Sequence, residues 1–254
     1  MSKQTKKAAT QGKSGGANKA FYLIILGVVV LGGAALVLAG MNRDAAVPGP
    51  MSLADTEVQA DAGVGLAEGA ADAPATLVEF ADYQCPACAQ FNGFTGKLLR
   101  QNYVSNGMLR WVVYEFPLDT HPNAVPAAIA GRCAGDQGRF WQMRDLLFAS
   151  QREWYAESSP NRTFESYADD LGLDRKQFAA CLSNREHLAE IMSAKKYGES
   201  LGVNSTPTLF MNGQPIPLTR RSYEALEEQI KALAAHAAAA GEVAAEDESS
   251  DAGS

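Results

Sequence analysis

Two cysteines, Cys85 and Cys88, stand two residues apart in the segment 80–91, FADYQCPACAQF. Sulfurs at this spacing can bind a metal, attach a haem, form a structural disulfide or exchange electrons. A c-type haem requires a histidine directly after the second cysteine, where this chain has Ala89. A zinc site needs a second pair of ligands at ligand spacing, and the three histidines of the chain are scattered. We therefore expect neither a metal nor an organic cofactor at this pair.

A structural disulfide and a redox pair remain as interpretations of the two cysteines. A disulfide that closes so small a loop removes little entropy from the unfolded chain, so it contributes little to stability. Pro86 fits the first turn of a helix, because that position needs no backbone N–H. Unpaired N–H groups at a helix start stabilise a thiolate, so Cys85 is interpreted as the attacking sulfur, with a lowered pKa. Cys88, one turn further along, is interpreted as the resolving thiol.

Glu79 lies six positions before Cys85, in a run that otherwise reads as an apolar strand. A carboxyl held partly out of water has a raised pKa and can carry the proton that Cys88 loses or gains. The alternative is a glutamate at the exposed edge of the strand. His121 precedes a predicted helix and is interpreted as a surface or capping residue, with a proton donor near the sulfurs as its alternative.

Thr206 and Pro207 stand just before the apolar segment TLF. A proline at the entrance of a strand tolerates a cis peptide bond. If this proline faces the sulfurs, it leaves the backbone of Thr206 free to pair with an extended substrate peptide, as the edge of a sheet does. Both residues therefore join the candidate site.

The elements that must position these residues follow from hydrophobic periodicity and turn residues. The segment 108–116 reads as a strand buried on both faces, and Asn212-Gly213 is typical of a type I′ turn between two strands. Ser222 is interpreted as the N-cap of a last amphipathic helix. The expected order is strand, helix, strand, helical block, hairpin and helix, over 75–81, 86–107, 108–116, 122–201, 206–218 and 222–236.

The segments VEFADYQCPACAQF and GRCAGDQGRFWQMRDLLF, with the Thr-Pro before a strand, resemble the DsbA family of thioredoxin-fold oxidoreductases, particularly its single-span anchored bacterial forms. The resemblance covers residues 75–235. It implies an α/β thioredoxin fold with a helical insertion over 119–200. Carried onto this sequence, the resemblance implies that Cys85 is the nucleophile and Cys88 its partner. It also implies that Pro207 is the cis proline, preceded by Thr206, and that Glu79 is the buried acid.

The dipeptide between the sulfurs departs from the best-known pattern of that family. Pro-Ala stands where Pro-His is usual, so no imidazolium lies beside the Cys85 thiolate. We expect the Cys85 pKa to be less depressed, which makes the pair a weaker oxidant. Thr206 before the proline is shared with isomerase-type and thioredoxin-like relatives. Oxidation remains the favoured role.

Cys133 and Cys181 fall in predicted helices of the insertion, 48 positions apart. Four cysteines allow three pairings, and free buried thiols are a further alternative. The resemblance includes forms with a second disulfide in this block, and so implies a structural Cys133–Cys181 bond. In the chain-entropy model such a loop contributes about 3 to 5 kcal/mol.

The N-terminal part of the chain predicts its location. Residues 1–19 carry five lysines and no acid, and 20–41 form an uncharged apolar run long enough to cross a bilayer as a helix. The positive-inside bias places the N-terminus in the cytoplasm and the main domain outside. A cleaved signal peptide is the alternative, because residues 37–39 have the spacing of a cleavage site, although the apolar core of a signal peptide is usually shorter.

The remaining segments complete the predicted organisation. Residues 42–73 are expected to form a flexible linker, 74–236 the folded domain, and 237–254 a disordered acidic tail. The formal net charge of −7 argues against a nucleic-acid-binding protein, which needs a basic face.

Together these features predict a thioredoxin-fold thiol:disulfide oxidoreductase behind a single N-terminal transmembrane helix, held in a bacterial cell membrane with its catalytic domain on the periplasmic side. We expect a monomer that introduces disulfides into exported cysteine-containing proteins. The resemblance implies a quinone-linked membrane reoxidant, DsbB-like or VKOR-like. Two alternatives remain open: a disulfide reductase or isomerase fed by a membrane electron donor, and a non-catalytic tethered chaperone or scaffold.

Overall fold

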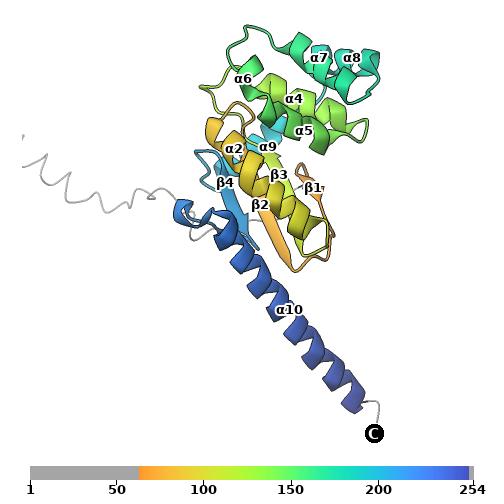
Figure 1. Cartoon of the computed structure of the whole chain (residues 1–254), viewed down its shortest axis with the longest axis vertical. Coiled ribbons are helices and arrows are strands. Elements are labelled where there is room, and N and C mark those ends of the chain that lie inside the picture. The colour runs from red at the N-terminus through yellow and green to blue at the C-terminus, as the bar shows by residue number, and fades with distance from the viewer. Residues whose placement is uncertain (1–62, 252–254) are drawn as a thin grey trace, which may run out of the picture. The chain divides into compact units, whose positions relative to one another are not determined.

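A computed structural model describes the backbone of residues 63–251 and the side chains of residues 63–241. Its centre is a five-stranded mixed sheet with the strand order β1-β3-β2-β4-β5 (Figure 1). The strands are β1 (Leu66–Glu68), β2 (Ala75–Ala81), β3 (Leu109–Glu115), β4 (Thr208–Met211) and β5 (Gln214–Pro215). The sheet confirms the predicted strands and the turn at Asn212-Gly213, where both residues have positive φ.

Strand β2 lies at the centre of the sheet, and its pairing positions the cysteines. It runs parallel to β3 and antiparallel to β4, with Phe80 opposite Thr208. The antiparallel pairing brings the start of β4 to the end of β2, where the cysteine segment begins. Successive side chains of β2 and β3 enter two separate hydrophobic clusters, one on each face of the sheet, as the apolar run of β3 predicted for that strand.

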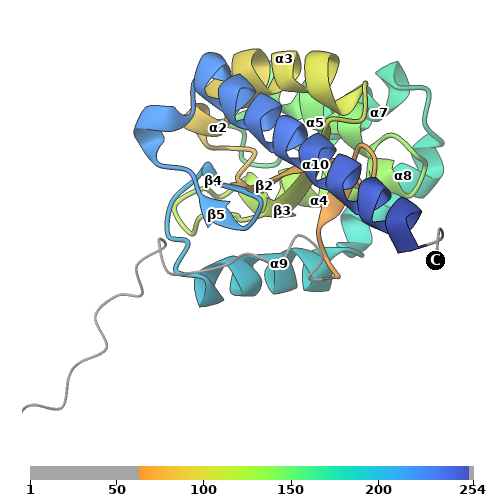
Figure 2. The same cartoon turned by 90° about the horizontal axis from the view of Figure 1, so that it is seen from below.

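Helices cover both faces of this sheet. Figure 2 shows α9 (Leu188–Ser200) on one side and the helix after β2, with α10 (Tyr223–Asp251), on the other. The helix after β2 is one continuous stretch in which two π-helical segments interrupt the α-helix. Its parts are α2 (Pro86–Phe91), η2 (Asn92–Gly96), α3 (Lys97–Leu99) and η3 (Arg100–Val104).

Five helices between β3 and α9 form a helical block, drawn at the top of Figure 1. They are α4 (Ala124–Gly135), α5 (Phe140–Ala149), α6 (Gln151–Trp154), α7 (Asn161–Asp170) and α8 (Arg175–Asn184). The predicted insertion over 119–200 also included α9, which instead packs on the sheet. Gly198 makes this close approach possible, because a Cβ there would lie 2.7 Å from the Phe116 ring.

The flexible linker predicted over 42–73 is corrected for its described part. Residues 66–68 form β1, which pairs antiparallel to β3 with Ala67 opposite Val112. Gly65 allows the strand to come close, because a Cβ there would lie 2.7 Å from the Tyr114 ring. A three-residue strand carries no period of its own, and only its partner strand reveals it.

The disordered tail expected over 237–254 also differs from the structure. The hydroxyl of Ser222 caps the start of α10 by accepting from the Ala225 N–H, and the helix continues to Asp251. Residues 235–241 are exposed, so burial does not hold them in the helix. Their alanines explain the extension, because alanine has the highest helix propensity.

The predicted basic segment 1–19 and membrane span 20–41 lie outside the described residues. So does most of the predicted linker, up to residue 62. Among residues 63–251, no helix combines the length and the apolarity that crossing a bilayer requires.

Candidate active site

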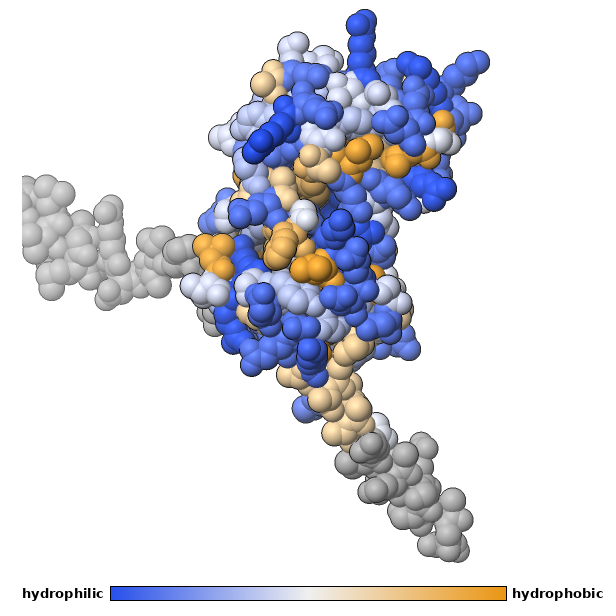
Figure 3. Space-filling view, in the orientation of Figure 1, coloured by the Kyte–Doolittle hydropathy of each residue, from blue (hydrophilic) through white to orange (hydrophobic). Residues whose placement is uncertain are grey.

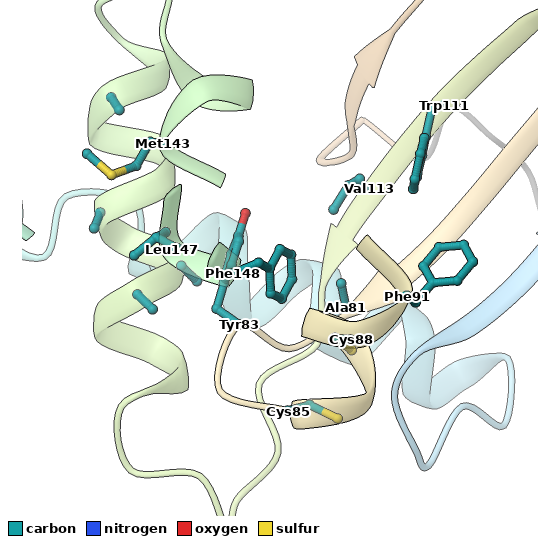
Figure 4. Close-up of a cluster of buried hydrophobic side chains, with 14 of the residues drawn as sticks. Ala81, Tyr83, Cys85, Cys88, Phe91, Trp111, Val113, Met143, Leu147 and Phe148 are labelled. Carbon is teal, nitrogen blue, oxygen red and sulfur yellow. The ribbon is translucent and has the colours of Figure 1, made fainter. Parts of the chain in front are cut away.

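Cys85 and Cys88 lie at the start of the helix that follows β2. Cys85 is the N-cap residue of α2 and Pro86 occupies the first helical turn, as the sequence predicted. The Cys85 N–H donates to the Asp82 carbonyl oxygen at 3.1 Å and closes the turn before the helix. Both cysteines are free thiols. Cys85 keeps 7% of its surface exposed and lies at the edge of the labelled group in Figure 4, whereas Cys88 is fully buried.

The surroundings of Cys85 favour its thiolate. The pKa of Cys85 is lowered from 9.0 to about 5; a hydrogen bond with Cys88 is the largest cause, and burial opposes the shift. The Thr206 side chain and the backbone N–H groups of Cys88 and Ala87 act in the same direction. Such N–H groups in the first turn of a helix have no helical partner. Cys85 is therefore ionised at neutral pH.

The pKa of Cys88 is shifted in the opposite direction. Burial raises the pKa of the Cys88 thiol well above its ordinary value, and the hydrogen bond to Cys85 and the nearby charge of Glu79 raise it further. Cys88 thus remains a neutral thiol while Cys85 is a thiolate. Two adjacent groups with pKa values pushed apart can divide the roles of nucleophile and proton carrier.

The loop before β4 faces the sulfurs. The Thr206–Pro207 peptide bond is cis, and the Cys85 Sγ lies 3.4 Å from the Thr206 carbonyl oxygen. The buried Thr206 hydroxyl has no hydrogen-bond partner at ordinary distance in the described part of the chain, which leaves it available to the thiolate. The structure therefore brings the predicted residues Thr206 and Pro207 together with Cys85.

Glu79 is buried beneath the cysteine pair, so the alternative of an exposed strand edge is wrong. Three side chains contact its carboxylate, none of which was predicted from the sequence. The Arg144 guanidinium lies 2.5 Å from Glu79 Oε2, and Trp111 Nε1 donates to the same oxygen at 3.1 Å. The Asn92 amide donates to Glu79 Oε1 at 2.8 Å and to the Cys88 carbonyl oxygen at 3.0 Å. Asn92 therefore links the carboxylate to the helix turn that carries Cys88.

Buried Asp82 holds the segment that leads into the cysteines. Its carboxylate accepts from the Gln84 N–H at 2.7 Å and from the Leu118 N–H at 2.8 Å. His121 Nδ1 lies 2.7 Å from Asp82 Oδ2. His121 thus braces the loop through Asp82, which neither its surface interpretation nor its proton-donor alternative anticipated.

Side chains of the helical block hold the same segment from the other side. Gln151 Nε2 donates to the Tyr83 carbonyl at 2.7 Å and to the Cys85 carbonyl at 3.1 Å. Neither Gln151 nor Arg144 was among the site residues predicted from the sequence. A signal existed for Arg144, because it stands four residues after Phe140 and on the same apolar helix face. A cation on a buried face needs a buried acid, and Glu79 is that acid.

The other two cysteines lie in the helical block. Cys133 of α4 and Cys181 of α8 form a disulfide with Cα atoms 5.9 Å apart. His187 lies beside them, with its ring nitrogen and the two sulfurs within 4.8 Å of one another. Sulfurs joined in a disulfide are not the thiolates that bind zinc, so we assign no metal to this cluster.

These features define the class of the protein. A mixed sheet of this order carries a Cys-x-x-Cys at a helix start and a cis proline before the adjacent strand, which is a thioredoxin-fold dithiol site. A family model described as thioredoxin matches residues 61–232, more than half of the chain. The chain belongs to this thioredoxin family.

Solved structures show the same fold. BdbD from Bacillus subtilis superposes with a TM-score of 0.60 at 21% identity, covering 67% of this chain and 92% of BdbD. The α-DsbA1 protein of Wolbachia pipientis has a TM-score of 0.59 at 20% identity, covering 69% of this chain and 93% of that protein. The MdbA thiol-disulfide oxidoreductase of Corynebacterium diphtheriae has a TM-score of 0.55 at 19% identity over the same shares. At these identities the likeness concerns the fold.

Curated relatives include parts of larger proteins. The Na(+)/H(+) antiporter NhaA 1 of Salinispora arenicola is 39% identical over 153 residues, which are 58% of this chain and 21% of the antiporter. NhaA 3 of Salinispora tropica is 37% identical over 147 residues, with the same shares. The chain thus spans about a fifth of the length of these curated relatives.

Proposed function

We propose that this protein introduces disulfide bonds into exported proteins by thiol:disulfide exchange at Cys85 and Cys88. The opposite ionisation of the two sulfurs supports this most directly: the Cys85 pKa is lowered to about 5 and the Cys88 pKa is raised. A thiolate stabilised in the reduced pair is a good leaving group in exchange. It therefore makes the corresponding disulfide more oxidising.

The reaction begins from the oxidised pair. A substrate thiolate attacks the Cys85 Sγ and forms a mixed disulfide, while the Cys85–Cys88 bond breaks and Cys88 leaves with the electron pair and takes up a proton. The second substrate thiol loses its proton to solvent and attacks the substrate sulfur of the mixed disulfide. Cys85 leaves as the thiolate. The substrate has lost two electrons, and the Cys85–Cys88 pair has gained them.

Glu79 is proposed to control the proton of Cys88 through its charge. Its carboxylate is linked through Asn92 to the Cys88 turn, and its negative charge raises the Cys88 pKa. A raised pKa favours protonation of Cys88 as it leaves. Arg144 holds the carboxylate in place, so Glu79 and Arg144 act as positioning residues in this step.

Thr206 and Pro207 are proposed to orient the substrate. Their loop lies against the Cys85 sulfur, so a peptide that reacts at Cys85 must run beside it. An extended peptide there can pair with the Thr206 backbone in the manner of an added strand.

Turnover requires a partner that removes two electrons from the reduced pair. We propose a quinone-linked, DsbB-like or VKOR-like membrane protein for this role, with the redox domain of a membrane-anchored monomer on the periplasmic side. The equilibrium of the Cys85–Cys88 pair with glutathione determines the direction of flux. A potential near about −120 mV supports the oxidase, and one near about −270 mV supports a thioredoxin-like reductase.

The function is tested with a reduced dithiol peptide and the oxidised protein. We expect the peptide disulfide to form with the wild type and with the double variant Cys133→Ala/Cys181→Ala, which keeps the redox pair. Cys85→Ser is expected to abolish oxidation, because the redox disulfide cannot form without the Cys85 sulfur. Full activity of Cys85→Ser would contradict the proposal and favour a non-catalytic role.

A further inference from the structure

A cavity of about 430 Å³ adjoins the redox pair. Its lining includes Ala87, which stands between the two cysteines, and the cis proline Pro207. Phe94 and Leu218 also line it and are 66% and 78% exposed, more than any other large apolar side chain among residues 63–241. Figure 3 shows hydrophobic side chains gathered in patches on an otherwise largely hydrophilic face. A peptide that reacts at Cys85 therefore meets apolar side chains next to the sulfur.

Arg221 places a positive charge in the same cavity. Its Nε donates to the Ile216 carbonyl at 3.2 Å, and its Nη1 donates to the Pro207 carbonyl. Both partners are neutral, and in the described part of the chain Arg221 forms no ion pair. A guanidinium has five N–H donors, so three remain for a ligand.

Arg221 is half buried, and a half-buried cation normally pairs with an acidic side chain, which Arg221 lacks in the described part of the chain. Burial lowers the pKa of Arg221, because desolvation disfavours the charged guanidinium, and the electrostatic interaction with the Cys88 sulfur opposes this shift. The other buried arginines of the structure have acidic partners: Arg132 pairs with Glu115, and Arg144 with Glu79. A half-buried cation that faces a cavity without an acid of its own is complementary to an acid brought by a ligand.

We propose that Arg221 selects substrate segments that carry an acidic side chain close to the reacting cysteine. The inference rests on the proposed exchange at Cys85. The bond from Arg221 to the Pro207 carbonyl fixes the guanidinium next to the loop along which the peptide runs. The substrate carboxylate binds Arg221, while an apolar neighbour in the peptide contacts Phe94 or Leu218. The preferred substrate is thus an extended cysteine peptide with both acidic and apolar neighbours.

The charge pair forms before the chemical step and changes no bond. The oxidised protein and a peptide with two thiols then yield the reduced pair and the peptide disulfide. Two electrons pass from the peptide to Cys85 and Cys88, one proton passes to Cys88, and one passes to solvent. Arg221 acts by raising the concentration of the encounter complex.

The test uses dithiol peptides that differ at a single position, which is Asp, Asn or Lys on either side of the first cysteine. Chromatography follows formation of the peptide disulfide by the oxidised full-length protein at low salt. We expect the wild type to oxidise the best Asp peptide about three- to ten-fold faster than its Asn counterpart, in line with one charge pair at a partly buried surface. The Lys peptide should be slowest, and added salt should reduce the difference.

Three variants separate the charge from other effects. Arg221→Gln keeps donors for the Pro207 carbonyl and should remove the preference, whereas Arg221→Lys should keep part of it. Arg220→Gln changes the exposed neighbour and should behave as the wild type. An acidic neighbour also alters the reactivity of the peptide thiol itself, so the Asp/Asn rate ratio of each protein is divided by the ratio that the same peptides show with oxidised glutathione.

The outcomes distinguish this inference from the proposed function. Oxidation of all peptides at equal corrected rates, by wild type and Arg221→Gln alike, would overturn the role of Arg221 and leave the exchange activity standing. Failure to oxidise any peptide would contradict the proposed function and the inference with it. A preference shared by the wild type and Arg220→Gln, and lost in Arg221→Gln, supports both.

Discussion

The guanidinium of Arg144 lies 2.5 Å from the carboxylate of Glu79, and both side chains are buried beneath the cysteine pair. Glu79 comes from the central strand β2, and Arg144 from α5 of the helical block. Arg144 also donates to the Asn92 side chain at 2.5 Å and lies 5.2 Å from the centroid of the Trp111 ring. One ion pair thus joins the sheet, the redox helix and the helical block at the point where Cys88 is buried.

This pair predicts a large effect of Arg144→Met on stability. Removal of one partner leaves the other charge buried without compensation, and we expect a loss of about 3 to 5 kcal/mol in the free energy of unfolding. Urea denaturation of the reduced protein measures it. Arg144→Met/Glu79→Gln should recover part of the loss, because the remaining amide carries no charge.

An exposed ion pair provides the control for that experiment. Arg175 of α8 pairs with Asp169 at 3.1 Å at the surface, where such pairs contribute about 0 to 1 kcal/mol. Arg175→Met should therefore change the stability little. If Arg144→Met and Arg175→Met had the same small effect on stability, the buried ion pair would not hold the helical block to the sheet as described.

The ionisation of Cys85 predicts the pH dependence of its reactivity. With a pKa of about 5, the Cys85 thiolate should form across a midpoint near that pH, well below the ordinary value of 9.0. The rate of alkylation of the reduced protein and its ultraviolet thiolate absorbance both follow this transition. Cys85→Ser should remove the transition, and a wild-type midpoint near 9 would show that the helix start and Cys88 do not stabilise the thiolate.

The same shift predicts how the stability of the reduced protein depends on pH. A thiol whose pKa is lowered in the folded state binds fewer protons there than in the unfolded chain, so stability rises with pH between about 5 and 9 and is lost as the pH falls through that window. The melting temperature of the reduced wild type, relative to that of Cys85→Ser, should rise from pH 5 to pH 8. A constant difference across this range would contradict the lowered pKa.

Removal of the disulfide in the helical block is predicted to lower the stability of the protein without lowering its rate of peptide oxidation. Cys133 and Cys181 close a loop of 48 residues, and its removal in Cys133→Ala/Cys181→Ala should cost about 3 to 5 kcal/mol in the chain-entropy model. Denaturation of the oxidised protein measures the loss. At a temperature where the variant is folded, its rate of peptide oxidation should match that of the wild type, and a lost rate would assign this disulfide to the reaction.

Local patterns in the sequence determined the strands that form the centre of the sheet and the start of the redox helix. Leu109–Glu115 was readable because its apolar residues alternate between two buried faces, and Ala75–Ala81 because it is a short run of β-prone residues. Pro86 fixed the helix start, since that position needs no N–H, and Cys85 became its N-cap. The Asn212-Gly213 turn was readable because both residues tolerate positive φ.

Only the tertiary structure decided which distant groups meet at the sulfurs. Asn92 and Arg221 have ordinary local surroundings in the sequence. Arg144 stands on an apolar helix face, which indicates burial but names no partner. The partners of all three are set by the packing of α5 and of the loop before α10 on the sheet. The β1 strand shows the same limit, because three residues gain their conformation from hydrogen bonds to β3. The sequence by itself determined where a thiolate forms, since a helix start is a local feature. The charges around that thiolate depend on contacts between segments far apart in the chain, which local periodicity does not encode.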